Sequence, residues 1–308
     1  MNRREFIYQT GAGLGLAAAG CLAGPGLLGD VVLGGEQPTL IEASGAPGPA
    51  TRAAVKGLGG MERFVAKGAK VVIKPNMSFS NPPEMATTTH PEVVKALVEM
   101  CWAAGASKVM VLDNTLRRAE DCLERSGIRA ALAGMPNTLL LVLTEERFFK
   151  TVDIPNHSTL PSAMVFKDVL DADTFIAAPV AKSHSSAGVS LSMKGMMGII
   201  YDRRSWHSKY SLDSAIVDLA TVIKPKLTVI DATRMLTTGG PGGPGDVIKP
   251  EKVIACTDMV AADAYTVSIG TWYGKQFAPD QIKHIKEAGE RKVGRIDVDK
   301  FSITKVKA

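Results

Sequence analysis

Cysteine is scarce in this sequence: its 308 residues include four, and none of them stands in a C-x-x-C pair. The local motifs that hold iron–sulfur clusters or cysteine-bound zinc are therefore missing, and the cysteines indicate no cofactor. Cys101 and Cys122 could pair in an oxidising compartment. The apolar helical pattern around Cys101 is equally typical of a buried free thiol.

Runs of lysine and arginine are missing as well, and so are basic stripes interleaved with aromatic residues, although the formal net charge is +5. Nucleic acid is therefore not an expected partner. Strongly apolar runs are also short. The N-terminal stretch 10–28 carries six glycines, which makes it a poor candidate for a membrane span of roughly 20 apolar residues.

The N-terminus has the pattern of an export signal. Arg3 and Arg4 precede an apolar pair and then a glycine-, alanine- and leucine-rich stretch, which resembles a twin-arginine signal. We therefore expect the twin-arginine export machinery to carry the chain to the periplasm or another extracytoplasmic space. Ala17–Ala19 offers an A-x-A cleavage site, whereas Ala19-Gly20-Cys21 resembles the end of a lipoprotein box and makes anchoring at Cys21 the less favoured alternative.

Residues 1–35 are assigned to this signal and a flexible start, and residues 36–308 to one α/β domain. Short β-branched runs alternate with amphipathic helical patterns, which predicts a mostly parallel sheet with helices on both faces. The predicted strands are 39–43, 70–74, 108–112, 139–143, 173–178, 226–231 and 252–255. The predicted helices are 49–64, 90–105, 119–125, 212–223 and 259–269. Residues 115–172 are less regular and are interpreted as a possible inserted lobe.

Polar residues follow most of the predicted strands, at the carboxyl ends where open α/β sheets bind ligands. We expect them to converge on one edge of the sheet. They are Lys74, Asn76, His90, Asp113, Lys182, His184, Lys194, Asp231 and the glycine-rich loop 237–246 with Gly240 and Gly242.

Several of these segments resemble the domain of unknown function 362 family. The matching segments are Ile73–Asn76, Thr88–Val94, Gly105–Val109, Ala181–His184, Leu191–Gly198, Val229–Asp231, Gly240-Pro241 with Gly245, and Ala261–Ala264. Members often carry twin-arginine signals, and many add a ferredoxin-like module of clustered cysteines. This sequence lacks that module, which puts electron transfer through a cluster of its own in doubt. The resemblance implies a site more than a function, because the family is named for its unestablished activity.

The candidate cations and the histidine each have a structural alternative. Lys74 is interpreted as an ammonium aimed at an anion, although a lysine at a strand end can also snorkel to solvent. Lys182 and His184 would face the same side of an extended strand and share one ligand. Lys194 lies among methionines and leucine that are typical of a core. His90 either caps a helix or acts as a neutral ligand at the helix N-terminus.

The carboxylates and the glycine loop also have two alternative interpretations each. Asp113, Asp231 and Asp263 are candidate bases or metal ligands, and each could equally be a turn or helix cap. Asp231 is favoured because it ends a β-branched run. The glycine loop is either a stiff lid or a source of backbone N–H groups for an anion. No spacing matches a metal motif, so the metal is unknown.

The leading functional hypothesis is an exported enzyme that acts on a small anionic molecule. Lys74, Lys182 and Lys194 would supply charge, with Asn76, His90, Gly240 and Gly242 in the ligand site, and His184, Lys182 and Asp231 would be the catalytic residues. Export of a folded protein makes a cytoplasmically loaded cofactor and redox-linked chemistry plausible. The alternatives are a non-catalytic binding or maturation module and an accessory subunit of a redox partner.

Overall fold

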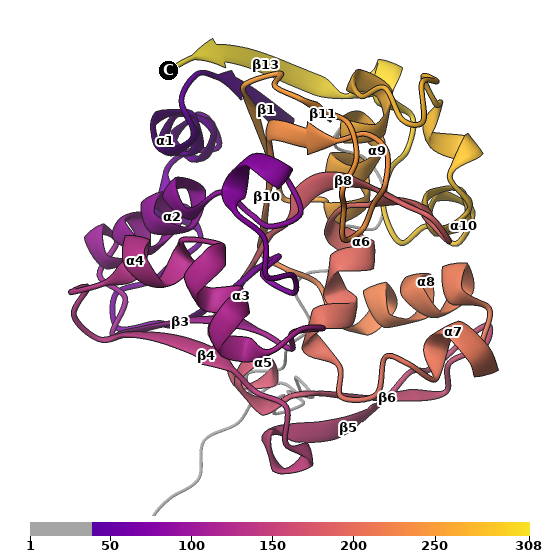
Figure 1. Cartoon of the computed structure of the whole chain (residues 1–308), viewed down its shortest axis with the longest axis horizontal. Coiled ribbons are helices and arrows are strands. Elements are labelled where there is room, and N and C mark those ends of the chain that lie inside the picture. Colours follow the sequence, from indigo (N-terminus) through magenta and orange to yellow (C-terminus); the bar gives the residue numbers. More distant parts are fainter. Residues whose placement is uncertain (1–38) are drawn as a thin grey trace, which may run out of the picture. The chain divides into compact units, whose positions relative to one another are not determined.

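The β-branched and aliphatic runs form one large sheet (Figure 1). The structure is a computed structural model that describes residues 39–308, so the predicted signal and the alternative anchor at Cys21 lie outside the described residues. Within residues 39–308 an 11-stranded sheet has the order β13-β1-β12-β10-β7-β2-β3-β4, with β8 and β11 beside β10 and β9 beside β8. Its strands are β1 (Thr39–Ser44), β2 (Lys70–Pro75), β3 (Lys108–Asp113), β4 (Thr138–Val142), β7 (Thr174–Ala178), β8 (Val180–His184), β9 (Gly188–Ser190), β10 (Leu227–Leu236), β11 (Val247–Ile248), β12 (Lys252–Cys256) and β13 (Ser302–Lys307).

Strand direction in this sheet is mostly parallel, as the sequence predicts. Strand β2 runs parallel to β3 and β7, β10 parallel to β7 and β8, β3 parallel to β4, and β1 parallel to β13. Strand β12 is antiparallel to both of its neighbours, β1 and β10. The carboxyl ends of β2, β3, β7 and β8 therefore lie on the same edge of the sheet, and this edge positions the candidate site.

Helices cover both faces of the sheet. Val71 and Ile73 of β2 pack into one core with α1 and α2, whereas Val72 between them packs into a second core with α8, as alternation along a strand requires. A third core lies between β10, β12 and α9. The helices are α1 (Pro47–Gly57), α2 (Pro91–Ala103), α3 (Ala119–Arg125), α4 (Ile128–Leu132), α5 (Lys167–Leu170), α6 (Ser192–Gly195), α7 (Trp206–Lys209), α8 (Leu212–Val222), α9 (Met259–Ile269) and α10 (Lys283–Glu290).

Two predicted elements differ in length from those observed. The helix predicted at 49–64 is α1, which ends at Gly57, followed by a separate 3-10 turn, η1 (Met61–Arg63). Gly57 lies so close to Ile41 that an added Cβ would be 2.9 Å from its Cγ2, and Gly60 has a φ of +88°. The strand predicted to end at residue 231 continues as β10 to Leu236.

The segment 115–172 divides between two structures. Strand β4 joins the main sheet beside β3, whereas β5 (Phe149–Asp153) and β6 (Ser162–Phe166) form a separate antiparallel two-stranded sheet. Residues 39–308 belong to one compact unit.

Cys101, Cys122 and Cys256 are free and buried. Burial raises the pKa of Cys101 and of Cys256 to about 12, so both are neutral thiols at physiological pH. None of the helices in the described part of the chain combines the length and the hydropathy that a membrane crossing requires.

Candidate functional site

A buried ion pair lies where β2 and β3 end. Lys74 Nζ is 3.2 Å from Asp113 Oδ1, and both side chains are almost fully buried. Lys74 Nζ also donates to the carbonyl of Pro75 (2.8 Å). The other carboxylate oxygen of Asp113 accepts from Met77 N and Ser78 Oγ, both at 3.0 Å. Burial lowers the pKa of Lys74, and the Asp113 carboxylate opposes part of that shift.

Gly198 makes this pair possible. It belongs to the 3-10 turn η4 (Met196–Ile199), and its carbonyl accepts from Asn114 N (2.8 Å). A Cβ added to Gly198 would lie 2.0 Å from Asp113 Oδ1 and 2.7 Å from Lys74 Nζ. The backbone of η4 therefore covers the ion pair at a distance that only glycine permits.

Lys182, on β8, is held by three partners. Its Nζ donates to Asn76 Oδ1 (2.9 Å) and to the Thr87 carbonyl (2.6 Å), and it lies 4.6 Å from the centroid of the Phe79 ring. The side chain is 1% exposed. Burial, followed by the charge of Lys74, lowers the pKa of Lys182 well below its usual value.

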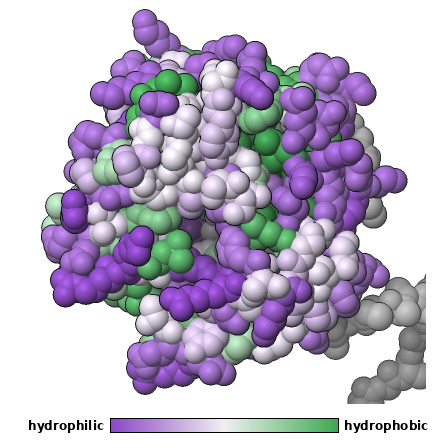
Figure 2. Space-filling model, turned by 45° about the vertical axis from the view of Figure 1, so that its right-hand side comes forward, coloured by the Kyte–Doolittle hydropathy of each residue, from purple (hydrophilic) through white to green (hydrophobic). Residues whose placement is uncertain are grey.

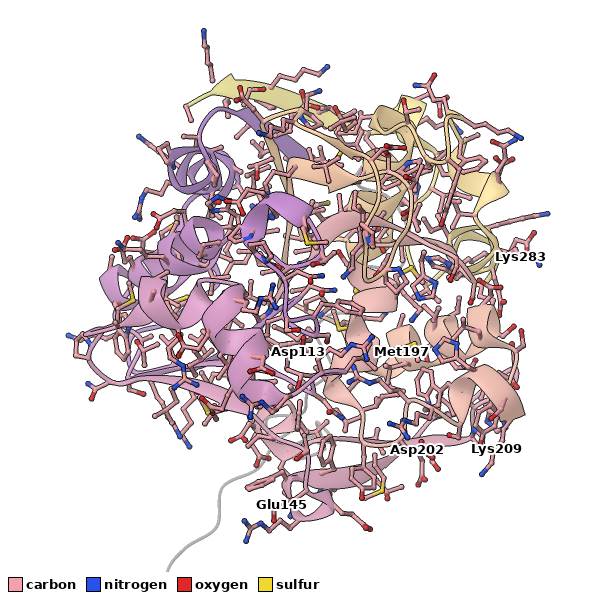
Figure 3. All side chains as sticks on the ribbon, viewed as in Figure 1. Asp113, Glu145, Met197, Asp202, Lys209 and Lys283 are labelled. Carbon is pink, nitrogen blue, oxygen red and sulfur yellow. The ribbon has the colours of Figure 1, made fainter. Side chains whose placement is uncertain are left out.

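Lys194 lies on the short helix α6 and is the least partnered of the lysines. Its Nζ donates to the Met197 sulfur at 3.0 Å, and no carboxylate of the described residues lies within 4.0 Å of it. Burial and the positive charges of Arg203 and Lys74 lower its pKa to about 7, with Asp213 acting in the opposite direction. Figure 3 shows Met197 and Asp113 in the middle of the view.

Helix α6 is held in place by a carboxylate from another element. Asp263 of α9 is fully buried and accepts from Ser192 N (2.8 Å) and Met193 N (2.9 Å). Burial raises the pKa of Asp263 to about 7, although these backbone donors oppose the shift. Asp263 thus acts as a distant N-terminal cap of the helix that carries Lys194.

His184 has a defined tautomer when neutral. Its Nδ1 accepts from Ser186 N and Ala187 N, both at 3.2 Å, so the proton of the neutral ring is on Nε2. Burial, then the charge of Lys194, lowers the pKa of His184 to about 3. The exposed ring of His207 is parallel to it, with centroids 6.4 Å apart. His184 is therefore a neutral hydrogen-bond donor at physiological pH.

Lys74, Lys182 and Lys194, which we call the lysine cluster, are each less than 9% exposed. They act on one another electrostatically, and Arg203 adds a fourth positive charge. Within the described residues, Asp113 is the carboxylate in contact with the cluster. Buried charge of one sign is costly unless the groups lose their protons or meet a counter-ion. The cluster is therefore suited to an anion.

A cavity of about 340 Å³ lies next to the end of β3, and none of the three lysines lines it. Its lining includes Asn114, which follows Asp113 in the chain, and Arg203, whose charge reaches Lys74 and Lys194. Leu116 and Tyr201 add apolar surface to the lining. The space-filling view shows a hollow near the middle of a face where hydrophilic and hydrophobic residues are mixed (Figure 2).

The glycine-rich loop packs on the Lys182 side of the site. Gly240 N donates to Ser183 Oγ (3.0 Å), and the Gly242 carbonyl accepts from Asn81 Nδ2 (2.9 Å). An added Cβ on Gly242 would lie 2.9 Å from the Phe79 ring. The loop thus packs against the Phe79 ring that contacts Lys182, and the Gly240 N–H is already used within the chain.

Asp231 and His90 lie in a neighbouring cluster. Asp231 is fully buried inside β10, where it accepts from His90 N (2.7 Å), Thr233 N (3.0 Å) and Thr233 Oγ1 (2.6 Å) and pairs with Arg234 (3.3 Å). His90 caps α2, with its Nδ1 accepting from Glu92 N. The structure thus brings together Lys74, Asn76, Lys182, His184 and Lys194, whereas the contacts of Asp231 and His90 are with other residues.

Sequence reasoning missed Arg203, Asp213 and His284. Arg203 belongs to a polar loop that resembles an ordinary solvated surface. His284 of α10 is fully buried, with its Nδ1 3.4 Å from Asp213 Oδ1, and its one sequence signal is a histidine on the apolar side of a helix. Among the described residues, no group of three or more histidine, cysteine or acidic side chains is arranged to hold a metal ion.

Three known proteins are similar to this chain over part of their length. A thylakoid-associated protein of Synechocystis sp. is 28% identical over 219 residues, which are 69% of this chain and 66% of that protein. Two solved structures align with low scores: a structural-genomics protein of Thermotoga maritima (TM-score 0.47, 14% identity, 72% of this chain and 59% of that one), and the lactate racemase apoprotein of Thermoanaerobacterium thermosaccharolyticum (TM-score 0.43, 11% identity, 71% and 54%). The chain thus spans less than two thirds of the length of each.

The model of the family described as "Domain of unknown function (DUF362)" matches residues 71–268. This range contains the lysine cluster, His184 and Asp263. The chain therefore belongs to the domain of unknown function 362 family.

Proposed function

We propose that the chain binds a small anionic molecule at the lysine cluster and transforms it by proton transfer. One observation carries this proposal: three buried lysines and Arg203 act on one another, and Asp113 is the contacting carboxylate among the described residues. A bound anion would offset that unbalanced charge. Positive groups that face a ligand in a dry site also stabilise negative charge that develops during a reaction.

The cluster divides naturally into roles. Lys74 and Lys182 have oxygen partners that hold their ammonium groups in fixed positions, so they would attract and orient the anion. Lys194, with a pKa of about 7, changes charge near physiological pH and would move the proton. His184 would donate through its Nε2–H to an oxygen of the ligand, since its pKa of about 3 makes it a poor base.

Ligand-dependent stabilisation tests the proposal. Carboxylate and phosphate anions should raise the melting temperature of the chain saturably, because a ligand that binds the folded state at 100 times its Kd adds about 2.7 kcal/mol. Chloride at equal ionic strength controls for screening. Lys182→Met should remove the effect, whereas the exposed Lys283→Met should keep it. An equal response of Lys182→Met and wild type would contradict the assignment.

A His184→Asn variant separates catalysis from simple capture. Asparagine keeps an acceptor for Ser186 N and Ala187 N but lacks the Nε2–H donor. Full biological activity of this variant would favour a non-catalytic binding or maturation module.

Export is a second part of the proposal and is supported by residues 1–35 alone. Arg3→Lys with Arg4→Lys should leave the protein in the cytoplasm, and intact mass of the exported wild type should show where the signal is removed. A lipid on Cys21 would support the anchored alternative, and an unmodified start downstream of Cys21 would exclude it.

A further inference from the structure

The three buried lysines differ in what their ammonium groups touch. Lys74 has a carboxylate and a carbonyl within 3.2 Å, and Lys182 has two oxygen acceptors and the Phe79 ring. Lys194 has the Met197 sulfur. A thioether is a weak acceptor, so Lys194 has the surroundings that least favour an ammonium ion. It is also the most exposed of the three, at 8% against 3% and 1%.

Most of the charges around Lys194 disfavour its ammonium form. Arg203, Lys74 and Lys182 surround it with positive charge, and the adjacent His184 and His284 are neutral. Asp213 is the opposing carboxylate, outside contact distance. Asp263 lies on helix α9, which packs against α6, and its carboxylate oxygens accept hydrogen bonds from Ser192 N and Met193 N. Apolar surroundings and neighbouring cations are the conditions that make a lysine amine nucleophilic.

The rest of the site suits a ligand that such an amine can attack. Lys74 and Lys182 hold N–H donors in fixed positions for a carboxylate, and the negative charge of that carboxylate would favour their ammonium forms. His184, two residues after Lys182 on β8, provides a neutral N–H donor for a second oxygen. These two functions match an anion that has a carbonyl oxygen next to its acidic group.

We propose that Lys194 forms an imine with the ligand of the lysine cluster, and that this ligand is an anion with an aldehyde or ketone carbonyl, such as a 2-oxo acid. This proposal rests on the proposed anion site. The neutral amine adds to the carbonyl carbon and gives a carbinolamine. A proton then moves from nitrogen to the former carbonyl oxygen, the C–O bond breaks, one water leaves, and the C=N bond forms. No electrons are exchanged with another group, so the step needs no oxidant or reductant.

Reductive trapping tests this proposal on the wild-type chain. The protein is incubated with pyruvate and sodium cyanoborohydride, which reduces an imine to a stable secondary amine. The intact mass should then rise by the mass of pyruvic acid less one oxygen atom, and peptide mapping should place the addition on Lys194. Lactate, an anion of similar size without the carbonyl, should add no mass. The same experiment with 2-oxoglutarate shows whether a longer 2-oxo acid is accepted.

Two comparisons within the chain sharpen the test. An ordinary exposed lysine has a pKa near 10.4, so on the order of one in a thousand such amines is neutral at pH 7. Labelling of Lys194 should therefore exceed that of the exposed Lys283 at least about a hundredfold at this pH. It should rise with pH around a midpoint of about 7.

Lys194→Arg keeps the positive charge but cannot form an imine. It should lose the trapped mass, whereas the exposed control Lys283→Met should keep it. If anions stabilise the wild type but no pyruvate or 2-oxoglutarate is trapped on Lys194, the imine proposal is wrong while the anion site stands. If neither anions nor 2-oxo acids have any effect, the anion site itself is wrong. The wild-type mapping gives this answer even if the variant does not fold.

Discussion

At the scale of single residues, the site depends on how charge is buried. Lys74 and Asp113 can be buried because they face each other and because the backbone of Gly198 closes over them without a side chain. The sequence shows that Lys74, Lys182 and Lys194 follow predicted strands. It does not show the burial of Lys74 with Asp113, because the backbone that covers this pair belongs to η4, much further along the chain.

Substitution of Gly198 should therefore be more damaging than substitution of its neighbour Gly195. In Gly198→Ala the new methyl group would meet Asp113 Oδ1 and Lys74 Nζ, and overpacking of this kind costs about 1–3 kcal/mol. An added Cβ on Gly195 meets Pro179 at an ordinary 3.8 Å, and alanine in a helix gains roughly 0.5–1 kcal/mol over glycine. Urea unfolding of both variants measures this difference. Equal stability of the two would contradict the described packing of η4 on the ion pair.

The neutral state of His184 predicts a pH dependence of stability. Its folded-state pKa of about 3 lies below the ordinary value of 6.5. Between these pH values the unfolded chain binds the proton and the folded chain does not, so this residue lowers stability as pH falls. The free energy of unfolding of wild type minus that of His184→Asn should thus be constant above pH 7 and should decline from pH 6.5 towards pH 4. A difference that does not change with pH would show that folding leaves the pKa of His184 unchanged.

At the scale of elements, the sequence predicts regular strands and helices well and misses elements that carry compensated charge. Strands β2, β3 and β7 and helices α2, α3, α8 and α9 lie where their patterns predict them. Strand β10 is longer than predicted. The charged residues Asp231 and Arg234 are typical of a strand end, but they form an ion pair with each other inside the sheet. The four-residue α6 has no helical pattern of its own, since its N-terminus depends on Asp263, about 70 residues further along the chain.

Removal of that distant cap should affect stability and the site together. Asp263→Ala leaves the buried Ser192 N and Met193 N without an acceptor, which costs about 1–3 kcal/mol, and frees the helix that positions Lys194. Asp258→Ala is the matched control: it removes the cap of α9, where Asp258 accepts from Val260 N and Ala261 N, at a cost of about 1 kcal/mol. Anion-dependent stabilisation should fall in the first variant and persist in the second. Loss of the anion response in both would show that α6 has no special part in the site.

At the scale of the whole described domain, the two halves of the sheet have different roles. The parallel strands position the site, and at the other end of the sheet β13 covers the edge of β1. The site lies on β2, β3 and β8, whereas β13 pairs with β1 at the far end of the strand order. The sequence predicts the parallel arrangement but neither the antiparallel β12 nor β13. β12 has the same short apolar pattern as a parallel strand, and β13 has lysines at alternate positions and little burial.

Deletion of residues 302–308 should therefore separate stability from ligand binding. Strand β13 pairs with β1 over six residues and presents Lys305 and Lys307 at the edge of the sheet, a common protection against pairing with other chains. Its loss would expose the edge of β1, which carries Leu40 and Ile41. It would also remove backbone hydrogen bonds that contribute about 1 kcal/mol each. We expect stability to fall by several kcal/mol and light scattering to show concentration-dependent association, while anions still stabilise the shortened chain because the lysine cluster is unchanged.

Lys305→Ala with Lys307→Ala should show association without the large loss of stability. A shortened chain that keeps its stability but loses its anion response would mean that the two halves of the sheet are coupled in a way that the strand order does not explain.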